Sequence, residues 1–165
     1  MSCHHDSCPS RRLFFQQMGS AALATLALSG LAPNLALAES VRAISGATLI
    51  PGQRAYPVPA ADGVSIDEAA GVIIVRAANR LYAFSTECPH RGAKLQFLAE
   101  EKTIYCRKHK ARFGGDGSWL SGRRTRALDR FPIRVANGQV VVATDTLLEQ
   151  DIDGAAYDAA EVMVP

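Results

Sequence analysis

Two short segments of the chain each combine a cysteine with a histidine. One is Cys88-Pro89-His90 and the other is Cys106-Arg107-Lys108-His109. Thiolate and imidazole groups at such close spacing are typical metal ligands, and together they suit zinc or an iron–sulfur cluster. The remaining two Cys and two His of the 165-residue chain all lie in the first eight residues. We therefore expect Cys88, His90, Cys106 and His109 to be the ligands of a metal centre.

The order of the ligands separates two kinds of centre. A zinc finger places two cysteines near each other and two histidines near each other. Here each segment supplies one Cys and one His, with fifteen residues between His90 and Cys106. This interleaving favours a binuclear cluster, in which both cysteines bind one iron and both histidines bind the other, as in a Rieske [2Fe–2S] centre. A structural zinc site is the less favoured alternative.

The sequence resembles the Rieske family beyond these four positions. Residues 88–93 are similar to the first cluster loop of Rieske ferredoxins and oxygenases, and Phe113, Asp116-Gly117 and Ser121-Gly122 are similar to the segment after the second loop. Residues 128–142 resemble the closing hairpin, so the likeness extends over residues 45–145. It implies one [2Fe–2S] cluster per chain, held by an antiparallel β fold with a small cluster-binding subdomain.

The sequence departs from the pattern of Rieske proteins in quinol-oxidising cytochrome bc complexes. Those proteins carry an extra, disulfide-bonded Cys in each loop, and a Ser and a Tyr after the second histidine. This chain has no such Cys, and Ala111 and Phe113 take the places of the Ser and the Tyr. Because hydrogen bonds to sulfur raise the potential, we expect a value in the lower part of the Rieske range of roughly −150 to +300 mV. Quinol oxidation is correspondingly disfavoured.

The elements that must position the ligand segments read as short strands. The expected strands are residues 47–50, 64–67, 72–76, 81–84, 103–106, 132–136 and 139–143, with a hairpin turn at Asn137-Gly138. Many short strands separated by turns predict an all-β antiparallel sandwich or barrel. We expect residues 52–63 and the acidic C-terminus to lack regular secondary structure. We expect no helix of ordinary length after residue 40, apart from a short one near residues 67–70.

The first 38 residues read as an export signal with a helical apolar segment. Arg11 and Arg12 precede an apolar run over residues 18–37, and Ala36-Leu37-Ala38 ends it before Glu39. The arginine pair resembles a twin-arginine signal, a route known for exporting folded proteins with their cofactors. We therefore expect a periplasmic protein with a signal at 1–38, a Rieske domain at 39–145 and an acidic tail at 146–165. If the signal is not cleaved, its twenty apolar residues could anchor the chain in a membrane.

Charge is nearly balanced overall but segregated along the chain. Residues 39–165 carry 16 Lys and Arg against 15 Asp and Glu, which gives no support for nucleic-acid binding. Residues 91–134 hold twelve basic and four acidic residues, whereas residues 135–165 hold six acidic residues and no basic one. This predicts an acidic redox protein, or a larger oxidoreductase subunit, docking over the histidine ligands. The acidic tail either folds back on the basic face or lies elsewhere.

The ligand inventory also bears on catalysis. A Rieske oxygenase needs a second iron site with two histidines and a carboxylate. Once His90 and His109 are used, residues 39–165 contain no further histidine. We therefore expect no catalytic residues and an exported one-electron carrier. The alternative is a membrane-anchored Rieske subunit of a quinol-oxidising cytochrome bc-type complex that retains its signal.

Overall fold

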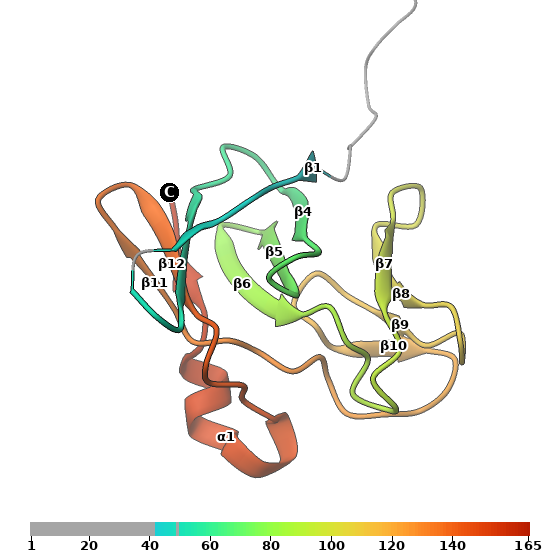
Figure 1. The fold of residues 1–165 in the computed structure, drawn as a ribbon. Coiled ribbons are helices and arrows are strands. Elements are labelled where there is room, and N and C mark those ends of the chain that lie inside the picture. Colours follow the sequence, from blue (N-terminus) through green and yellow to red (C-terminus); the bar gives the residue numbers. More distant parts are fainter. Residues whose placement is uncertain (1–41, 49) are drawn as a thin grey trace, which may run out of the picture. The chain divides into compact units, whose positions relative to one another are not determined.

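The computed structural model describes residues 42–48 and 50–165, so the expected export signal lies outside the described residues (Figure 1). Short strands dominate this part of the chain, in agreement with the all-β prediction. In chain order the elements are β1 Arg42–Ala43, β2 Ala47–Thr48, β3 Gln53–Pro57, β4 Gly63–Asp67, β5 Val72–Ala77, β6 Arg80–Ser85, β7 Leu95–Leu98, β8 Thr103–Cys106, β9 Arg112–Phe113, β10 Trp119–Ser121, β11 Ile133–Ala136, β12 Gln139–Ala143, α1 Gln150–Ala159 and β13 Val162–Met163.

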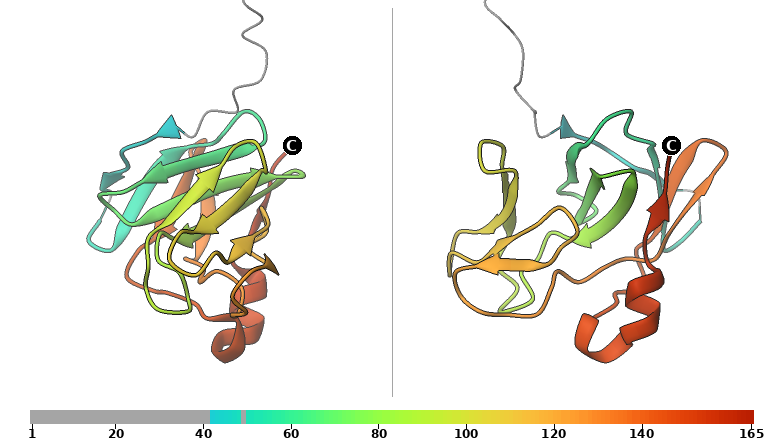
Figure 2. Two further views of the ribbon diagram at one scale, coloured as in Figure 1. Left: turned by 90° about the vertical axis from the view of Figure 1, so that its right-hand side faces the viewer. Right: turned by 180° about the vertical axis from the view of Figure 1, so that it is seen from behind.

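The strands form three sheets that are antiparallel except for the β1–β4 pair. A central sheet has the strand order β1-β4-β5-β6-β13. Two four-stranded sheets, β10-β9-β8-β7 and β11-β12-β3-β2, lie on opposite sides of the central β4–β6 strands (Figures 1 and 2). The sheet of β7 to β10 carries the second ligand segment and corresponds to the expected cluster-binding subdomain.

The central sheet is buried on both faces, and strand β5 shows this residue by residue. Ile73 and Val75 pack into the cluster of side chains that faces β7 to β10, whereas Val72 and Ile74 pack into the cluster that faces β3 and β12. Because successive side chains of a strand point to opposite faces, a strand covered on both sides reads as a continuous apolar run. The sequence Val-Ile-Ile-Val at residues 72–75 is such a run.

Three expectations about loose segments and helices were wrong. Strand β3 lies in the segment expected to be loose and pairs with both β12 and β2. Helix α1 and strand β13 occupy most of the acidic C-terminal segment, where no helix was expected, and β13 pairs with β6. The short helix expected near residues 67–70 is a turn, in which the Asp67 carboxylate accepts a hydrogen bond from the Ala70 N–H.

The helix gave little sequence signal for a physical reason. Tyr157 is its one buried side chain, the side chain of the N-cap residue Glu149 makes no capping hydrogen bond, and Gly154 has a non-helical backbone conformation within it. Tyr157 packs with Ala127, Leu148 and Ala160, and its hydroxyl donates to the Leu128 carbonyl. Tyr157 is thus the only buried side chain of a helix that has no apolar stripe of the usual width, and polar contacts supply the rest of its attachment to the body.

Arg130 connects this helix to the rest of the body. The Arg130 side chain is buried, and its guanidinium lies 4.2 Å from the Tyr157 ring centroid and 5.0 Å from that of Tyr82. It donates hydrogen bonds to the carbonyls of Tyr157 and Asp116. One basic side chain thus ties helix α1, strand β6 and the loop after β9 together.

The acidic C-terminal segment lies against the body rather than across the ligand segments. Glu149 and Asp151 pair with Arg126, and Glu161 pairs with Arg80. Arg126 belongs to the basic stretch 91–134 but lies outside both ligand segments, and Arg80 lies outside that stretch. The C-terminal segment therefore pairs with one member of the basic stretch and leaves the cations of the ligand segments without an ion pair to it. Within residues 42–48 and 50–165, no helix is long and apolar enough to cross a membrane.

Candidate metal centre

The two ligand segments have the same backbone construction. In the first, the Cys88 N–H donates to the Ala93 carbonyl and the Gly92 N–H donates to the Cys88 carbonyl, each at 2.8 Å. In the second, Cys106 and Ala111 make the equivalent bond at 2.9 Å, and the Lys110 N–H donates to the Cys106 carbonyl at 2.8 Å. The fifth residue of each loop has a positive φ: +62° at Gly92 and +57° at Lys110. We call residues 88–93 and 106–111 the first and second ligand loops.

The strands fix where these loops begin. Strand β6 ends at Ser85, shortly before the first ligand loop begins at Cys88. Strand β8 ends on Cys106, the first residue of the second ligand loop. An isolated bridge between Glu87 and Lys94 closes the base of the first loop, and the pairing of Leu95 with Cys106 brings the two loops together. Each loop is therefore held at its base by sheet pairing.

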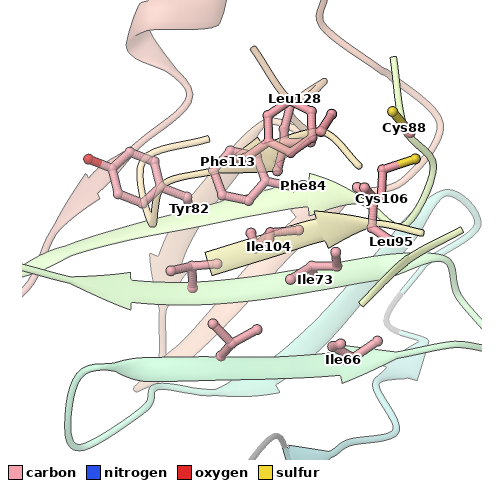
Figure 3. Packing of buried hydrophobic residues seen from close by; sticks show 13 residues of the cluster. Ile66, Ile73, Tyr82, Phe84, Cys88, Leu95, Ile104, Cys106, Phe113 and Leu128 are labelled. Carbon is pink, nitrogen blue, oxygen red and sulfur yellow. The ribbon is translucent and has the colours of Figure 1, made fainter. Parts of the chain in front are cut away.

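The two predicted thiol ligands are buried side by side. Cys88 is 2% exposed and Cys106 is fully buried. Their sulfur atoms lie at one end of the packed side chains that fill the space between the central sheet and β7 to β10 (Figure 3). Burial, together with the neighbouring Cys106, raises the pKa of the Cys88 thiol to about 11, although hydrogen bonds from the N–H groups of His90 and Arg91 oppose the increase. A bound cation is what would hold such thiols as thiolates.

The two predicted imidazole ligands meet closer to the surface. The Nδ1 atoms of His90 and His109 are 3.0 Å apart, and their rings are inclined at 81°. Partial burial lowers the pKa of His90, and the positive charges of His109, Arg123 and Arg91 lower it further, so the neutral form that binds metals is favoured. Two nitrogen ligands about 2.1 Å from one metal ion lie about 3.0–3.4 Å apart, which matches this pair.

The donor set fits a binuclear cluster better than a single ion. Among the described residues, no group of three or more Cys, His, Asp or Glu side chains is arranged to hold one metal ion. The four side chains form a sulfur pair inside and a nitrogen pair outside. A Rieske cluster takes two cysteines on one iron and two histidines on the other, so two separate pairs are the arrangement it requires.

Strand β10 and the three residues after it, residues 119–124, support the second ligand loop and were not identified as part of the site from the sequence. We call residues 119–124 the third loop. The Arg123 N–H donates to the His109 carbonyl at 3.4 Å, and the Trp119 Nε1–H donates to the Arg123 carbonyl at 3.0 Å. A Cβ atom on Gly122 would lie 1.9 Å from the Lys110 carbonyl oxygen, so the two backbones are in direct contact. The Ser121-Gly122 pair, with φ of +81° at the glycine, was the available sequence signal.

Ala111 and Phe113, the positions at which the sequence lacks hydroxyl groups, are both fully buried. Ala111 belongs to the second ligand loop, and Phe113 packs in the same cluster of side chains as Cys88 and Cys106. Neither side chain can donate a hydrogen bond. The expected consequence for the reduction potential remains a prediction.

Comparison with known proteins gives the family of this region. Residues 53–132 match the model of the Rieske [2Fe–2S] domain. Over 78 residues the chain is 28% identical to the ferredoxin component of the alkene monooxygenase system of Xanthobacter autotrophicus, which covers 46% of this chain and 64% of that protein. Over 72 residues it is 29% identical to the cytochrome b6-f complex iron-sulfur subunit of Chlorobaculum tepidum, which covers 44% of this chain and 40% of that protein.

Two solved structures are similar to part of the chain. The plasma membrane Rieske protein PetC3 from Synechocystis PCC 6803 matches with a TM-score of 0.40 and 21% identity, over 55% of this chain and 85% of that one. The ferredoxin of carbazole 1,9a-dioxygenase from Nocardioides aromaticivorans IC177 matches with a TM-score of 0.37 and 24% identity, over 53% and 88%. On the match of the family model, residues 53–132 of this chain are a Rieske [2Fe–2S] domain, an electron-carrying domain that binds a [2Fe–2S] cluster.

Proposed function

We propose that this chain is an exported one-electron carrier whose cluster is held by Cys88 and Cys106 on one iron and by His90 and His109 on the other. When bound, the cluster takes up and releases single electrons. The role of the chain's own residues is to bury the thiol pair, present the imidazole pair near the surface and supply charge around it. The electrons pass to or from a periplasmic redox partner.

The observation that carries this proposal is that two equivalent loops bring the four predicted ligands together, with the cysteines buried and the histidines near the surface. The sulfur atoms are enclosed in packed side chains, whereas both histidines remain partly exposed. Electron transfer needs a short path from the cofactor to a partner, and the histidine side offers it. The thiol side, which packs against the central sheet, shields the cluster from water.

The export part of the proposal rests on the sequence of residues 1–38. The arginine pair, the apolar run and the Ala-x-Ala end form a signal of the twin-arginine type. Export after folding suits a protein whose cofactor must be inserted first. Periplasmic location follows from this signal.

The partner part of the proposal rests on charge. Arg107, Lys108 and Lys110 flank His109 in the second ligand loop, and all three side chains are exposed. A partner with an acidic surface, either a redox protein or a larger oxidoreductase subunit, would be attracted to the histidine side by this charge.

Replacing one histidine ligand tests the proposal. We expect purified His109→Ala to lose the visible absorption of the wild-type protein, and the EPR signal of its reduced form, because one iron loses a ligand. Lys108→Ala is the matched control in the same loop and should keep both spectra. An unchanged spectrum in His109→Ala would show that the ligand assignment is wrong.

The alternative is a membrane-anchored Rieske subunit of a quinol-oxidising cytochrome bc-type complex, and the similarity to the Chlorobaculum tepidum subunit favours it. The missing loop cysteines, together with Ala111 and Phe113, disfavour it. Sequencing the N-terminus of the native protein separates the two. Glu39 as the first residue supports the exported carrier, and a retained residue 1–38 segment supports the anchored subunit.

A further inference from the structure

We propose that the loop at residues 119–124 forms, together with the two ligand loops, a docking surface for an acidic redox protein, and that Arg123 and Arg124 are its principal cations. This inference rests on the proposed function as an electron carrier. It assigns a binding role to a loop that supplies no cluster ligand.

The first step is that this loop lies beside the histidine pair. The hydrogen bond from the Arg123 N–H to the His109 carbonyl and the contact of Gly122 with the Lys110 backbone fix the loop against the second ligand loop. The His109 ring in turn contacts His90, and their Nδ1 atoms are 3.0 Å apart. A partner that contacts Arg123 would therefore be next to both histidines.

The second step is that the cations around the ligands have no carboxylate partners. In or beside the three loops, six exposed basic side chains make no ion pair with a described residue: Arg91, Arg107, Lys108, Lys110, Arg123 and Arg124. Away from these loops, Arg134 is exposed and bonded only to the Gln53 side chain, and five other basic side chains form ion pairs: Arg76–Asp62, Arg80–Glu161, Lys94–Glu87, Arg112–Glu101 and Arg126–Asp129. This distribution leaves a concentrated positive charge at one place on the surface.

The third step is that the loop holds a tryptophan and an arginine in a fixed arrangement. The Arg124 guanidinium lies 5.0 Å from the Trp119 ring centroid, and the Trp119 indole N–H is bonded to the Arg123 carbonyl. Tryptophan and arginine are among the residues most enriched in interface hot spots.

These observations favour an acidic protein as the occupant. These six cations have no carboxylate of the described chain as a partner, and the three C-terminal carboxylates that form ion pairs are bonded to Arg126 and Arg80 instead. The Trp119–Arg124 pair favours a partner that presents an apolar or aromatic side chain within its acidic surface. Nearly balanced total charge weighs against a general polyanion such as a nucleic acid.

Charge reversal at matched positions tests the inference in the cluster-loaded protein. Arg123→Glu and Arg124→Glu are compared with Arg134→Glu, an exposed position on β11 that contacts Gln53 and makes the same change in net charge. The reduced proteins are mixed in a stopped-flow instrument with an acidic c-type cytochrome and, separately, with a basic one, over a series of salt concentrations. Midpoint potentials are measured for each variant so that a change in driving force is separated from a change in docking.

We expect Arg123→Glu and Arg124→Glu to slow electron transfer to the acidic cytochrome by about tenfold at low salt, with a loss of the salt dependence. Arg134→Glu should stay within about twofold of wild type. Equal slowing by all three variants would overturn the docking surface while leaving the carrier function intact. So would tight, salt-dependent binding of the wild type to phosphatidylglycerol vesicles without preference between the cytochromes, which would indicate a lipid surface. Absence of a cluster spectrum in the wild type would instead overturn the proposed function.

Discussion

Arginine and lysine have opposite uses in the ligand loops and in the larger body. In the body, Arg130 is buried among aromatic rings and Arg126 sits among three carboxylates, so positive charge holds segments together. Around the ligands, six exposed cations make no ion pair within the described residues. The difference indicates that the body uses charge for packing, whereas the ligand region leaves its charge available to a partner.

The two regions also differ in how their backbone is held. Strands β5 and β6 of the central sheet pair over six residues, while β9 has two residues and β10 has three. The ligand loops depend instead on a few specific hydrogen bonds and on residues with positive φ. We expect stability to be most sensitive to changes in the body, and the cluster spectrum to be most sensitive to changes in the loops.

The largest expected effect comes from removing the buried arginine. Arg130→Ala should lower the free energy of unfolding by about 3–5 kcal/mol, because it removes desolvated cation–π contacts and two charged hydrogen bonds to carbonyls. Arg124→Ala is the control, since this exposed arginine also lies over an aromatic ring; it should change stability by about 0.5 kcal/mol or less. Urea unfolding followed by circular dichroism measures both. Similar losses in the two variants would abolish the distinction between packing and docking arginines.

A backbone change in the third loop should affect the cluster rather than only stability. Gly122→Ala places a Cβ against the Lys110 carbonyl and a side chain at φ +81°, so we expect a cost of about 1–3 kcal/mol and a shifted second ligand loop. The EPR spectrum should change. Gly138→Ala is the control, because it has φ +71° but no atom within 4 Å of the added Cβ. If both variants keep the wild-type spectrum, the third loop does not position the ligands.

A buried carboxylate makes the body sensitive to acid. Burial alone would raise the pKa of Asp67, but hydrogen bonds from Gly46, Ala70 and Tyr56 outweigh it and hold the pKa below its ordinary value. The ionised Asp67 carboxylate therefore stabilises the folded state fully at pH values above the ordinary aspartate pKa of about 3.9, and this stabilisation is lost as the pH falls below that value.

Asp67→Asn should consequently lower the free energy of unfolding near neutral pH by about 1.5–3 kcal/mol. The variant should also lose less of that free energy than the wild type when the pH is lowered from about 5 to about 2. The comparison uses thermal unfolding at several pH values, with the exposed Asp62→Asn as the control. A variant that is as acid-sensitive as the wild type would place the titrating group elsewhere.

The smallest expected effect is a tuning of the cluster. Ala111→Ser introduces a hydroxyl donor in the second ligand loop, and one ordinary hydrogen bond of about 1 kcal/mol corresponds to an increase in midpoint potential of about 40 mV. Ala127→Ser, which is also buried but packs near helix α1, should leave the potential unchanged. Redox titration followed by EPR measures both. A potential that falls in Ala111→Ser would contradict the explanation based on missing hydroxyl groups.

Local patterns predicted much of the sheet structure. The strands at residues 64–67, 72–76, 81–84, 103–106 and 139–143 were expected within a residue or two of β4, β5, β6, β8 and β12, and the Asn137-Gly138 turn joins β11 to β12 as expected. Strand β3 was missed because Pro57 and polar Gln53 and Arg54 leave only Ala55 and Tyr56 as its buried residues. Its stability comes from β12 and β2 on either side.

The sequence by itself determined the identity and spacing of the predicted ligands, the family resemblance and the all-β class. These depend on residue types at fixed short separations, which the chain carries in any conformation. Only the tertiary structure decided that the third loop lies against the second ligand loop, that Arg130 is enclosed by rings from β6 and α1, and that the unpaired cations gather around the histidines. Those contacts join residues far apart in the sequence, and their free energy depends on burial and partners that exist only once the sheets have packed.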